Sequence, residues 1–377
     1  MFYSTFPFIL LLSLALSCPD KVTESNETSN LPLDKIKLPE GFKIDIFAQD
    51  IDNARSLALG DKGTVFVSTR SEKNVYAIID NDQDYVADRV ITLIDDIKMP
   101  NGVAFYQGDL YIAGITSIWK LENIEENLDN VPEPILITDK FPDQSHHAWK
   151  FIRFGPDGKL YVPVGAPCNV CKEEEAIYST ITRMNPDGSD LEIYAHGVRN
   201  SVGFDWHPVT EELWFTDNGR DMMGDDIPPC EINHAPNKDM HFGFPFCHGN
   251  EIKDPEFGDQ HSCDEFTPPV QELVAHVAPL GMRFYTGNMF PNDYKNQILF
   301  AEHGSWNRSK KSGYRVMKLT LEDDYKTPIS YEVFAEGWLD VAKDENWGRP
   351  VDVLQMPDGS LLVSDDFADV IYRISHE

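Results

Sequence analysis

The feature of this chain that most constrains its fold is a hairpin pattern that occurs six times. An apolar strand leads into a tight turn and a second apolar strand follows; the turn is Pro-Asp-Gly at 156–158 and at 357–359. Proline presets φ, aspartate bonds its own backbone and glycine accepts a positive φ, so this tripeptide favours a turn. The six hairpins lie at residues 57–69, 103–113, 152–164, 202–216, 282–301 and 353–364.

The regular spacing of the hairpins predicts the architecture. Six units in roughly 340 residues leave about 57 residues per unit, which suits a four-stranded blade with long loops. The flanking runs have strand length, and few stretches show a sustained helical period. A β-sandwich is the alternative, but regular repetition of one motif favours a radial arrangement. The sequence therefore predicts an all-β chain: a six-bladed β-propeller with four-stranded antiparallel blades at 35–377, with its longest insertion at 217–280.

The N-terminal segment is typical of an export signal. A short apolar run at 8–16 ends in small residues, and it is shorter than the roughly 20 residues of a spanning helix. Ala15-Leu16-Ser17-Cys18 resembles a bacterial lipobox, with Cys18 as the acylated residue. We expect a signal at 1–18, a flexible polar tether at 19–34, and a periplasmic or lipid-anchored location.

The charge of the chain excludes some partners. It has 63 acidic against 32 basic residues and a formal net charge of −31. A chain this acidic lacks the excess of positive charge that binding to nucleic acid or to an anionic membrane surface requires. Membrane contact is therefore expected only through a lipid anchor, and the excess carboxylates are available to divalent cations.

Five cysteines follow the signal segment, and an exported chain should pair them. The natural pairs are Cys168 with Cys171 and Cys247 with Cys263, which leaves Cys230 unpaired. The alternative is a zinc site that uses the Cys-x-x-Cys pair and nearby histidines.

Several stretches are more polar than their turns require. In a propeller the ends of equivalent strands converge on one face of the channel, so residues far apart in sequence share one funnel. Histidine, arginine, asparagine and backbone carbonyls beside aspartate favour an anionic ligand and a hard cation. The stretches lie at 144–149, 196–202, 216–226, 302–308 and 347–352.

The motifs in these stretches resemble those of the pyrroloquinoline quinone (PQQ)-dependent sugar dehydrogenases, and most closely the L-sorbosone dehydrogenase-like branch. They are His-Gly-Val-Arg-Asn at 196–200, Trp-Phe-Thr-Asp-Asn-Gly-Arg-Asp at 214–221, His-Gly-Ser-Trp-Asn-Arg at 303–308 and Trp-Gly-Arg-Pro-Val-Asp-Val at 347–353. The likeness runs from about Leu38 to the C-terminus. It implies a dehydrogenase that oxidises a sugar, aldose or sugar-derived aldehyde and passes electrons to a periplasmic carrier or a dye.

The resemblance also implies which residues bind PQQ, a tricarboxylate ortho-quinone. Arg199 and Asn200 fall where the family grips the cofactor, and Arg349 falls where an arginine pairs with its carboxylate. Glucose-oxidising relatives carry a lysine near the position of His303, so in this chain His303 or Arg308 would bind the cofactor in place of that lysine. Those relatives also have a second arginine at the position of Val351.

The implied metal is Ca²⁺, bound by the backbone carbonyls of Gly219 and Arg220, and it would polarise the quinone. The implied general base is His147, eight residues before Gly155, which would take the hydroxyl proton of the substrate. Glucose-oxidising relatives orient this base with an aspartate at a position near Ala166, so another group must hold His147.

Two other functions compete with this interpretation. A propeller could bind carbohydrate or protein without redox chemistry, or act as a Ca²⁺-dependent, lactonase-like hydrolase. A lactonase should place side-chain carboxylates and asparagines around a channel metal. The polar stretches here carry arginine and histidine, which favours an anionic cofactor.

Overall fold

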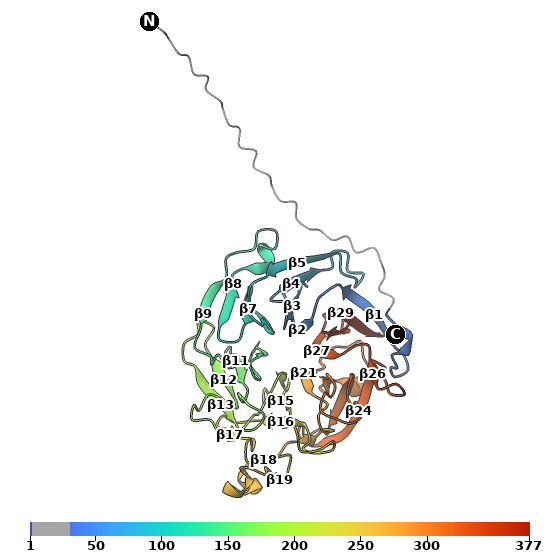
Figure 1. The fold of residues 1–377 in the computed structure, drawn as a ribbon. Coiled ribbons are helices and arrows are strands. Elements are labelled where there is room, and N and C mark those ends of the chain that lie inside the picture. The colour runs from blue at the N-terminus through green and yellow to red at the C-terminus, as the bar shows by residue number, and fades with distance from the viewer. Residues whose placement is uncertain (2–30) are drawn as a thin grey trace. The chain divides into compact units, whose positions relative to one another are not determined.

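The computed structural model describes residue 1 and residues 31–377 (Figure 1). The export signal, the acylation of Cys18 and most of the tether were predicted for residues that lie outside this part. Within residues 31–377 the predicted architecture is confirmed, because six sheets of four antiparallel strands surround a central channel. No helix among the described residues is long and apolar enough to cross a bilayer.

The strands of each blade follow one another from the channel outward. Blade 1 contains β2 (Ala54–Leu59), β3 (Val65–Thr69), β4 (Val75–Ile79) and β5 (Arg89–Ile94). Blade 2 contains β6 (Gly102–Tyr106), β7 (Asp109–Ala113), β8 (Ile118–Leu121) and β9 (Ile135–Thr138). Blade 3 contains β10 (Arg153–Phe154), β11 (Leu160–Val164), β12 (Thr180–Met184) and β13 (Glu192–His196), with β17 (Met240–His241) added in parallel.

The remaining three blades follow the same order. Blade 4 contains β14 (Phe204–Trp206), β15 (Leu213–Asp217), β16 (Glu231–Ala235) and β20 (Gln271–Glu272). Blade 5 contains β21 (Pro279–Phe284), β22 (Ile298–Glu302), β23 (Arg315–Leu321) and β24 (Pro328–Glu336). Blade 6 contains β27 (Pro350–Gln355), β28 (Leu361–Asp365), β29 (Val370–His376) and β1 (Phe42–Gln49).

The minor elements lie in the connections. Two small hairpins are formed by β18 (Cys247–His248) with β19 (Ile252–Lys253) and by β25 (Leu339–Asp340) with β26 (Glu345–Asn346). The 3₁₀ turns are η1 (Leu33–Lys35), η2 (Ile124–Glu126), η3 (Gly258–Gln260), η4 (Cys263–Glu265) and η5 (Asn292–Tyr294).

The first strand of the described chain closes the ring. Strand β1 pairs antiparallel with β29, from Phe42 opposite His376 to Gln49 opposite Val370, and becomes the outermost strand of blade 6. The ends of the propeller are therefore joined by backbone hydrogen bonds. This closure places blade 1 beside blade 6, which brings residues about 300 positions apart into contact.

The core lies between neighbouring blades. Val65, Phe66 and Val67 on β3 are all fully buried, and the Phe66 ring stacks on Phe105 of blade 2 with 5.7 Å between centroids. Strands covered on both faces carry continuous apolar runs because neither face meets water. The hairpin sequences are therefore apolar throughout rather than alternating.

The cysteines pair as predicted. Disulfides join Cys168 to Cys171 and Cys247 to Cys263, and Cys230 is a free, buried thiol. The sulfurs of the Cys-x-x-Cys pair are bonded to each other, so they are not available as the thiolate ligands that a zinc site needs.

The propeller has two distinct edges. The Pro-Asp-Gly turns join the first and second strands of blades 3 and 6, and we call this side the turn edge. At the opposite side the first strand of each blade begins and the second strand ends, and we call it the site edge. Each blade therefore contributes two short segments to the site edge, around the channel that β2, β21 and β27 surround in Figure 1.

Candidate functional site

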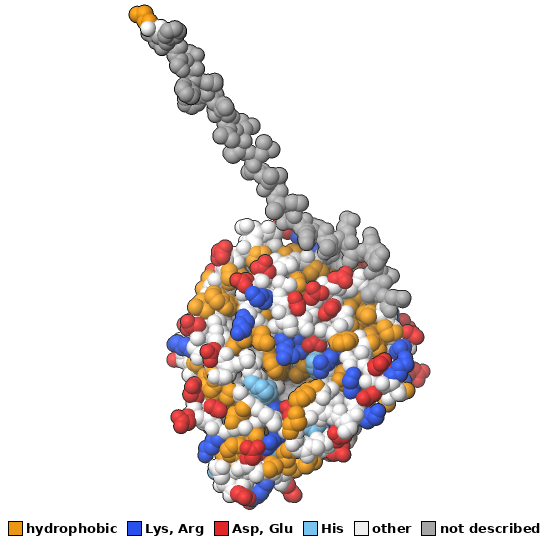
Figure 2. Space-filling model, in the orientation of Figure 1, with side chains coloured by type: hydrophobic (Ala, Val, Ile, Leu, Met, Phe, Trp, Pro, Cys, Tyr) orange, Lys and Arg blue, Asp and Glu red, His pale blue; other side chains and the backbone are white. Residues whose placement is uncertain are grey.

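A cavity of about 360 Å³ opens at the site edge of the channel. Figure 2 shows basic and histidine side chains around a hollow near the centre of the propeller. Six of the residues predicted from the sequence line this cavity: His147, Arg199, Asn200, Gly219, His303 and Arg349. Blades 3, 4, 5 and 6 or the segments that lead into them supply these residues, so the predicted convergence of distant motifs is confirmed.

The lining of the cavity is basic. Four arginines contribute to it: Arg55, Arg70, Arg199 and Arg349. Asp221 is the single carboxylate among the described residues that line it. The chain as a whole has a net charge of −31, but guanidinium groups outnumber carboxylates in this cavity, so the local charge is positive. Such a cavity favours an anionic ligand.

One buried carboxylate, that of Asp366, organises part of this wall. Its two oxygens contact Arg55 Nη1 at 2.8 Å and His303 Nε2 at 2.7 Å. Burial lowers the pKa of His303 to about 4, even though Asp366 opposes that shift. His303 is therefore neutral near pH 7, and Asp366 balances the charge of Arg55.

Arg70 and Arg349 lack such a partner. Neither guanidinium has a carboxylate within ion-pair distance among the described residues; Arg70 lies over the Trp149 ring at 4.1 Å, and Arg349 donates to the carbonyls of His303 and Gly304. Burial, followed by repulsion from Arg55, lowers the pKa of Arg70 to about 10, and Arg349 adds to this shift. The guanidiniums of Arg55, Arg70 and Arg349 are thus close enough to repel one another, and only that of Arg55 is ion-paired with Asp366.

His147 lies in the segment that leads into blade 3, and the centroid of its ring is 6.0 Å from that of Trp149. Its Nδ1 is 2.9 Å from the carbonyl oxygen of Ala166, and this contact supplies the orienting group that the sequence left open. A carbonyl only accepts, so Nδ1 carries the proton and the lone pair is on Nε2. Burial, followed by Arg199 and His146, lowers the pKa of His147 to about 2.

The backbone holds His147 in a sparsely populated conformation. Its φ is +50°, in the left-handed region that histidine adopts more readily than most residues. A Cβ on Gly165 would lie 2.6 Å from the His147 Cβ and 2.8 Å from its carbonyl oxygen. Only glycine at 165 leaves space for the histidine, so the end of β11 positions the imidazole.

Arg199 is held entirely by the chain. Its Nε and Nη2 donate to the backbone and side-chain oxygens of Asn169, at 2.9 and 3.0 Å. Nη1 donates to the carbonyls of Asn218 and Gly219, at 2.9 and 2.8 Å, and Nη2 also contacts Asp221 at 3.2 Å. Asn169 lies between Cys168 and Cys171, so the disulfide-closed turn presents the oxygens that fix this guanidinium.

The fully buried carboxylate of Asp217 sets the backbone beneath Arg199 and Asn200. Its oxygens accept the backbone N–H groups of Arg199 at 2.9 Å and Asn200 at 2.6 Å. Burial raises the pKa of Asp217 to about 6, although these N–H groups oppose the shift. The end of β15 thereby directs both side chains toward the cavity.

Two predicted residues lie elsewhere. The Arg308 guanidinium binds the carbonyls of Asp225 and Ala275 and the Asp226 carboxylate, and it is not among the residues that line the cavity. Arg220, which was predicted as a metal ligand through its backbone carbonyl, is not among the residues that line the cavity, and its side chain pairs with Asp254 and Glu256.

Arg55, Arg70, Trp149 and Asp366 were missed in the sequence. A positional signal existed for two of them, because Arg70 and Asp366 directly follow the second strands β3 and β28. His303 and Gly165 occupy the same position after β22 and β11. A polar residue or glycine at this position marks the site edge in any blade.

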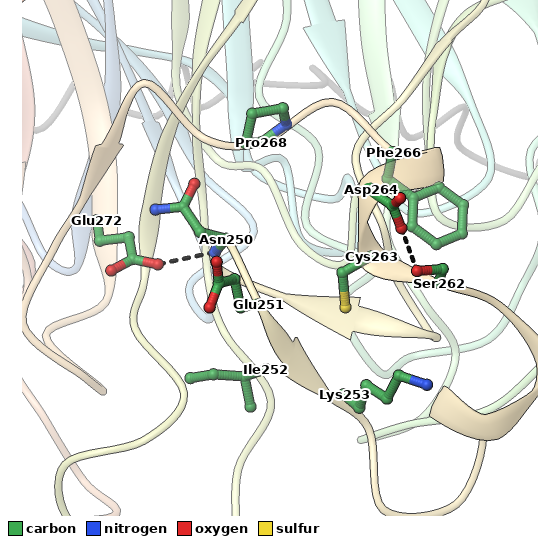
Figure 3. A pocket seen from close by; sticks show the side chains of 10 residues that line it. All are labelled: Asn250, Glu251, Ile252, Lys253, Ser262, Cys263, Asp264, Phe266, Pro268 and Glu272. Atoms are coloured by element: carbon green, nitrogen blue, oxygen red, sulfur yellow. Dashed lines mark hydrogen bonds between the residues drawn. The ribbon is translucent and has the colours of Figure 1, made fainter.

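A second, larger depression lies away from the channel, beside the hairpin of β18 and β19 (Figure 3). Its volume is about 1020 Å³, and its charged lining residues are Glu251, Lys253, Asp264 and Glu272. Glu272 accepts the backbone N–H of Asn250 at 2.8 Å, which fixes its rim. No histidine or arginine is among the described residues that line it, so within this part of the chain it lacks the convergent groups of the channel cavity.

Comparison with known proteins places the chain in a family. A family profile described as a domain of unknown function, DUF7133, matches residues 28–375. The chain belongs to the DUF7133 family. An uncharacterized protein of Borreliella burgdorferi (strain ATCC 35210 / DSM 4680 / CIP 102532 / B31) is 36% identical over 357 residues, which cover 91% of each protein.

Solved structures similar to this DUF7133 protein share its fold. The Trichoderma reesei protein of carbohydrate-active enzyme family AA12 has a TM-score of 0.78 at 18% identity, over 91% of this chain and 98% of that one. The PQQ domain of pyranose dehydrogenase from Coprinopsis cinerea, in its holo form, gives 0.76 at 16%, over 90% and 97%. The PQQ-bound aldose sugar dehydrogenase of Streptomyces coelicolor gives 0.64 at 17%, over 90% and 100%.

Proposed function

We propose that this DUF7133 protein is a PQQ-dependent dehydrogenase of a sugar, aldose or sugar-derived aldehyde, with the cofactor in the site-edge cavity. One observation carries the proposal: Arg55, Arg70 and Arg349 lie around Asp366, and among the described residues only Arg55 of the three is ion-paired with a carboxylate. An anionic ligand would supply the missing negative charge. The PQQ-bound structures among the fold relatives give that ligand a chemical identity.

The residues present fit a tricarboxylate. Arg70 and Arg349 have no competing carboxylate, and Arg349 Nη1 has no hydrogen-bond partner among the described residues. The cavity volume of about 360 Å³ lies within the usual range of small-molecule sites. Bound PQQ would supply the oxidising quinone that accepts a hydride.

His147 is the proposed general base. With Nδ1–H held by Ala166, its Nε2 is free to take the hydroxyl proton of a substrate in the cavity. The neutral imidazole accepts that proton without first losing one. Carboxylates bound by the arginines would raise the low pKa of His147 toward a useful value, because nearby negative charge stabilises the imidazolium.

The rim of the cavity offers a surface for the substrate. Trp306 lines it and is 68% exposed, so most of its indole surface is open to contact with a ligand. An indole face at a polar cavity suits the apolar face of a sugar ring.

Export, a periplasmic or lipid-anchored location, the sorbosone-like branch and an external electron acceptor are parts of the same proposal.

The test is PQQ binding and turnover by the purified full-length chain. PQQ should quench tryptophan fluorescence saturably, and a redox dye should be reduced with some members of a panel of aldoses and sugar aldehydes. Arg349→Gln is the matched variant, because it removes one free guanidinium and keeps an amide donor. Absence of PQQ binding under every condition would contradict the proposal. Binding without turnover across a broad panel would favour a non-redox binding protein.

A further inference from the structure

The fold relatives include a calcium structure of the Trichoderma reesei AA12 protein, and the sequence motifs predict Ca²⁺ at the carbonyls of Gly219 and Arg220. The contacts around Gly219 test whether a divalent cation fits there. The Gly219 carbonyl accepts a hydrogen bond from Arg199 Nη1 at 2.8 Å, and the same nitrogen reaches the Asn218 carbonyl at 2.9 Å. A cationic side chain therefore already contacts the predicted metal ligand.

The surrounding carboxylates do not provide a second set of ligands. Asp221 is paired with Arg199 at 3.2 Å, and both oxygens of Asp217 accept backbone N–H groups. Calcium takes six to eight oxygen ligands at about 2.3–2.6 Å. An ion bound to the carbonyls of Gly219 and Arg220 would lie close to the guanidinium, and no carboxylate among the described residues is free there to offset the repulsion. The charge at this place therefore does not fit a divalent cation.

We propose that the Arg199 guanidinium takes the place of the divalent cation, so that the anionic cofactor binds next to a positive charge built into the protein. All five N–H donors of this group are bonded to the chain: to both oxygens of Asn169, to the carbonyls of Asn218 and Gly219, and to Asp221. A guanidinium held in this way acts as a fixed charge, and it does not deprotonate near neutral pH. The inference rests on the proposed function for the identity of the ligand.

The loop geometry supports this role. A Cβ on Gly219 would lie 2.6 Å from the Pro229 carbonyl oxygen, so the carbonyl-bearing loop is packed tightly from behind. The other side of Arg199 is fixed by Asn169 in the turn closed by Cys168 and Cys171. The guanidinium is therefore held between two constrained segments, as a resident ion would be.

The first test compares PQQ binding to the full-length protein in EGTA and in CaCl₂, measured by fluorescence quenching. The dissociation constants should agree within about twofold. Binding that requires Ca²⁺, or that tightens about tenfold or more with it, would overturn the inference. Arg199→Gln should weaken binding in EGTA by about tenfold or more, and unchanged binding by this variant would also overturn it.

The second test does not depend on PQQ. Arg199→Gln frees the carbonyls of Asn218 and Gly219, so Ca²⁺ alone should raise the melting temperature of this variant more than that of the wild type. An equal or larger shift in the wild type would overturn the inference. For this comparison Asp82→Asn is introduced into both the Arg199→Gln variant and the protein that retains Arg199, because Asp80, Asp82 and Asp88 form an acidic cluster on a hairpin that could bind Ca²⁺ independently. Failure of PQQ to bind would contradict the proposed function and leave this comparison intact.

Discussion

The two mouths of the channel use arginine in opposite ways. At the turn edge, a cavity of about 280 Å³ contains Arg153 and Arg283, and each has a carboxylate partner. Arg153 lies 2.9 Å from Asp205, and Arg283 lies 3.6 Å from Asp352. At the site edge, Arg70 and Arg349 have no carboxylate partner among the described residues.

The difference separates structural from ligand-binding charge. The charge of a buried guanidinium that is paired with a carboxylate is neutralised within the protein. Such a pair stabilises the fold only while both groups are present. A guanidinium without a partner, exposed to a cavity, favours any anion that enters. The same residue type therefore predicts a loss of stability at one mouth and a loss of affinity at the other.

The sharpest contrast is between two buried histidines. His147→Gln at the site edge should lower turnover by about 10²–10⁴-fold, because the proton acceptor is lost, while PQQ still binds. His207 follows β14 at the turn edge, where its Nδ1 accepts the backbone N–H groups of Val209 and Thr210. His207→Gln should lower the melting temperature and leave turnover per folded molecule unchanged. Dye-reduction kinetics measure the effect on turnover, and thermal unfolding measures the effect on stability. Full activity of His147→Gln would refute the assignment of His147 as the base.

Acid should weaken the site edge through His303. Its folded pKa, about 4, is below the unfolded value of 6.5, so the unfolded chain binds the extra proton between these values. The neutral form of His303 therefore contributes to the free energy of unfolding above pH 6.5. This contribution is lost as the pH falls from 6.5 toward 4. The shift corresponds to about 3 kcal/mol.

Urea unfolding across this range measures that contribution against His303→Gln. The variant should be less stable than the wild type at pH 7, and the difference should shrink toward pH 4. His147, whose pKa is also lowered, titrates in both proteins and cancels in the comparison. A difference that is independent of pH would contradict the assigned protonation state.

Matched arginine variants test the comparison of the two mouths directly. Arg70→Gln and Arg349→Gln should each weaken PQQ binding by about 10- to 100-fold, as expected for hydrogen bonds to a charged group, with little change in stability. Arg283→Gln should leave PQQ affinity unchanged and cost about 3 kcal/mol of unfolding free energy, because Asp352 becomes an unpaired buried charge. Equilibrium titration and chemical denaturation of all three variants give the result. Equal affinity losses at both mouths would remove the distinction.

The smallest of these effects on turnover is expected when a methyl group is added at Gly165. Gly165→Ala should lower turnover by about tenfold, because the new Cβ displaces His147 and proton transfer depends steeply on geometry. Gly63 has a φ of +92° at the turn edge, and no atom lies within 4 Å of a Cβ built there. Gly63→Ala should therefore cost about 1 kcal/mol through backbone strain alone and leave turnover unaffected. Similar turnover in the two variants would show that Gly165 does not position the base.

Local chemistry made much of the fold predictable. The turn signals and apolar runs are properties of short segments, so six hairpins could be counted before any contact was known. The arginines and histidines in the polar stretches predicted the character of the cavity and six of its lining residues. The sequence could not place Arg308 relative to the cavity, because its partners, Asp225, Asp226 and Ala275, come from distant loops.

The sequence by itself determined the six-bladed repeat and the arginine- and histidine-rich composition of one edge. Only the tertiary structure decided which charges remain unpaired. Pairing of β1 with β29 brings blade 1 against blade 6, so Arg55 meets Asp366 across 311 positions. Arg70 and Arg349 form no ion pair with any carboxylate in the part of the chain that the structure describes. Ion pairing depends on distances of a few ångströms between blades, and those distances exist only after the ring has closed.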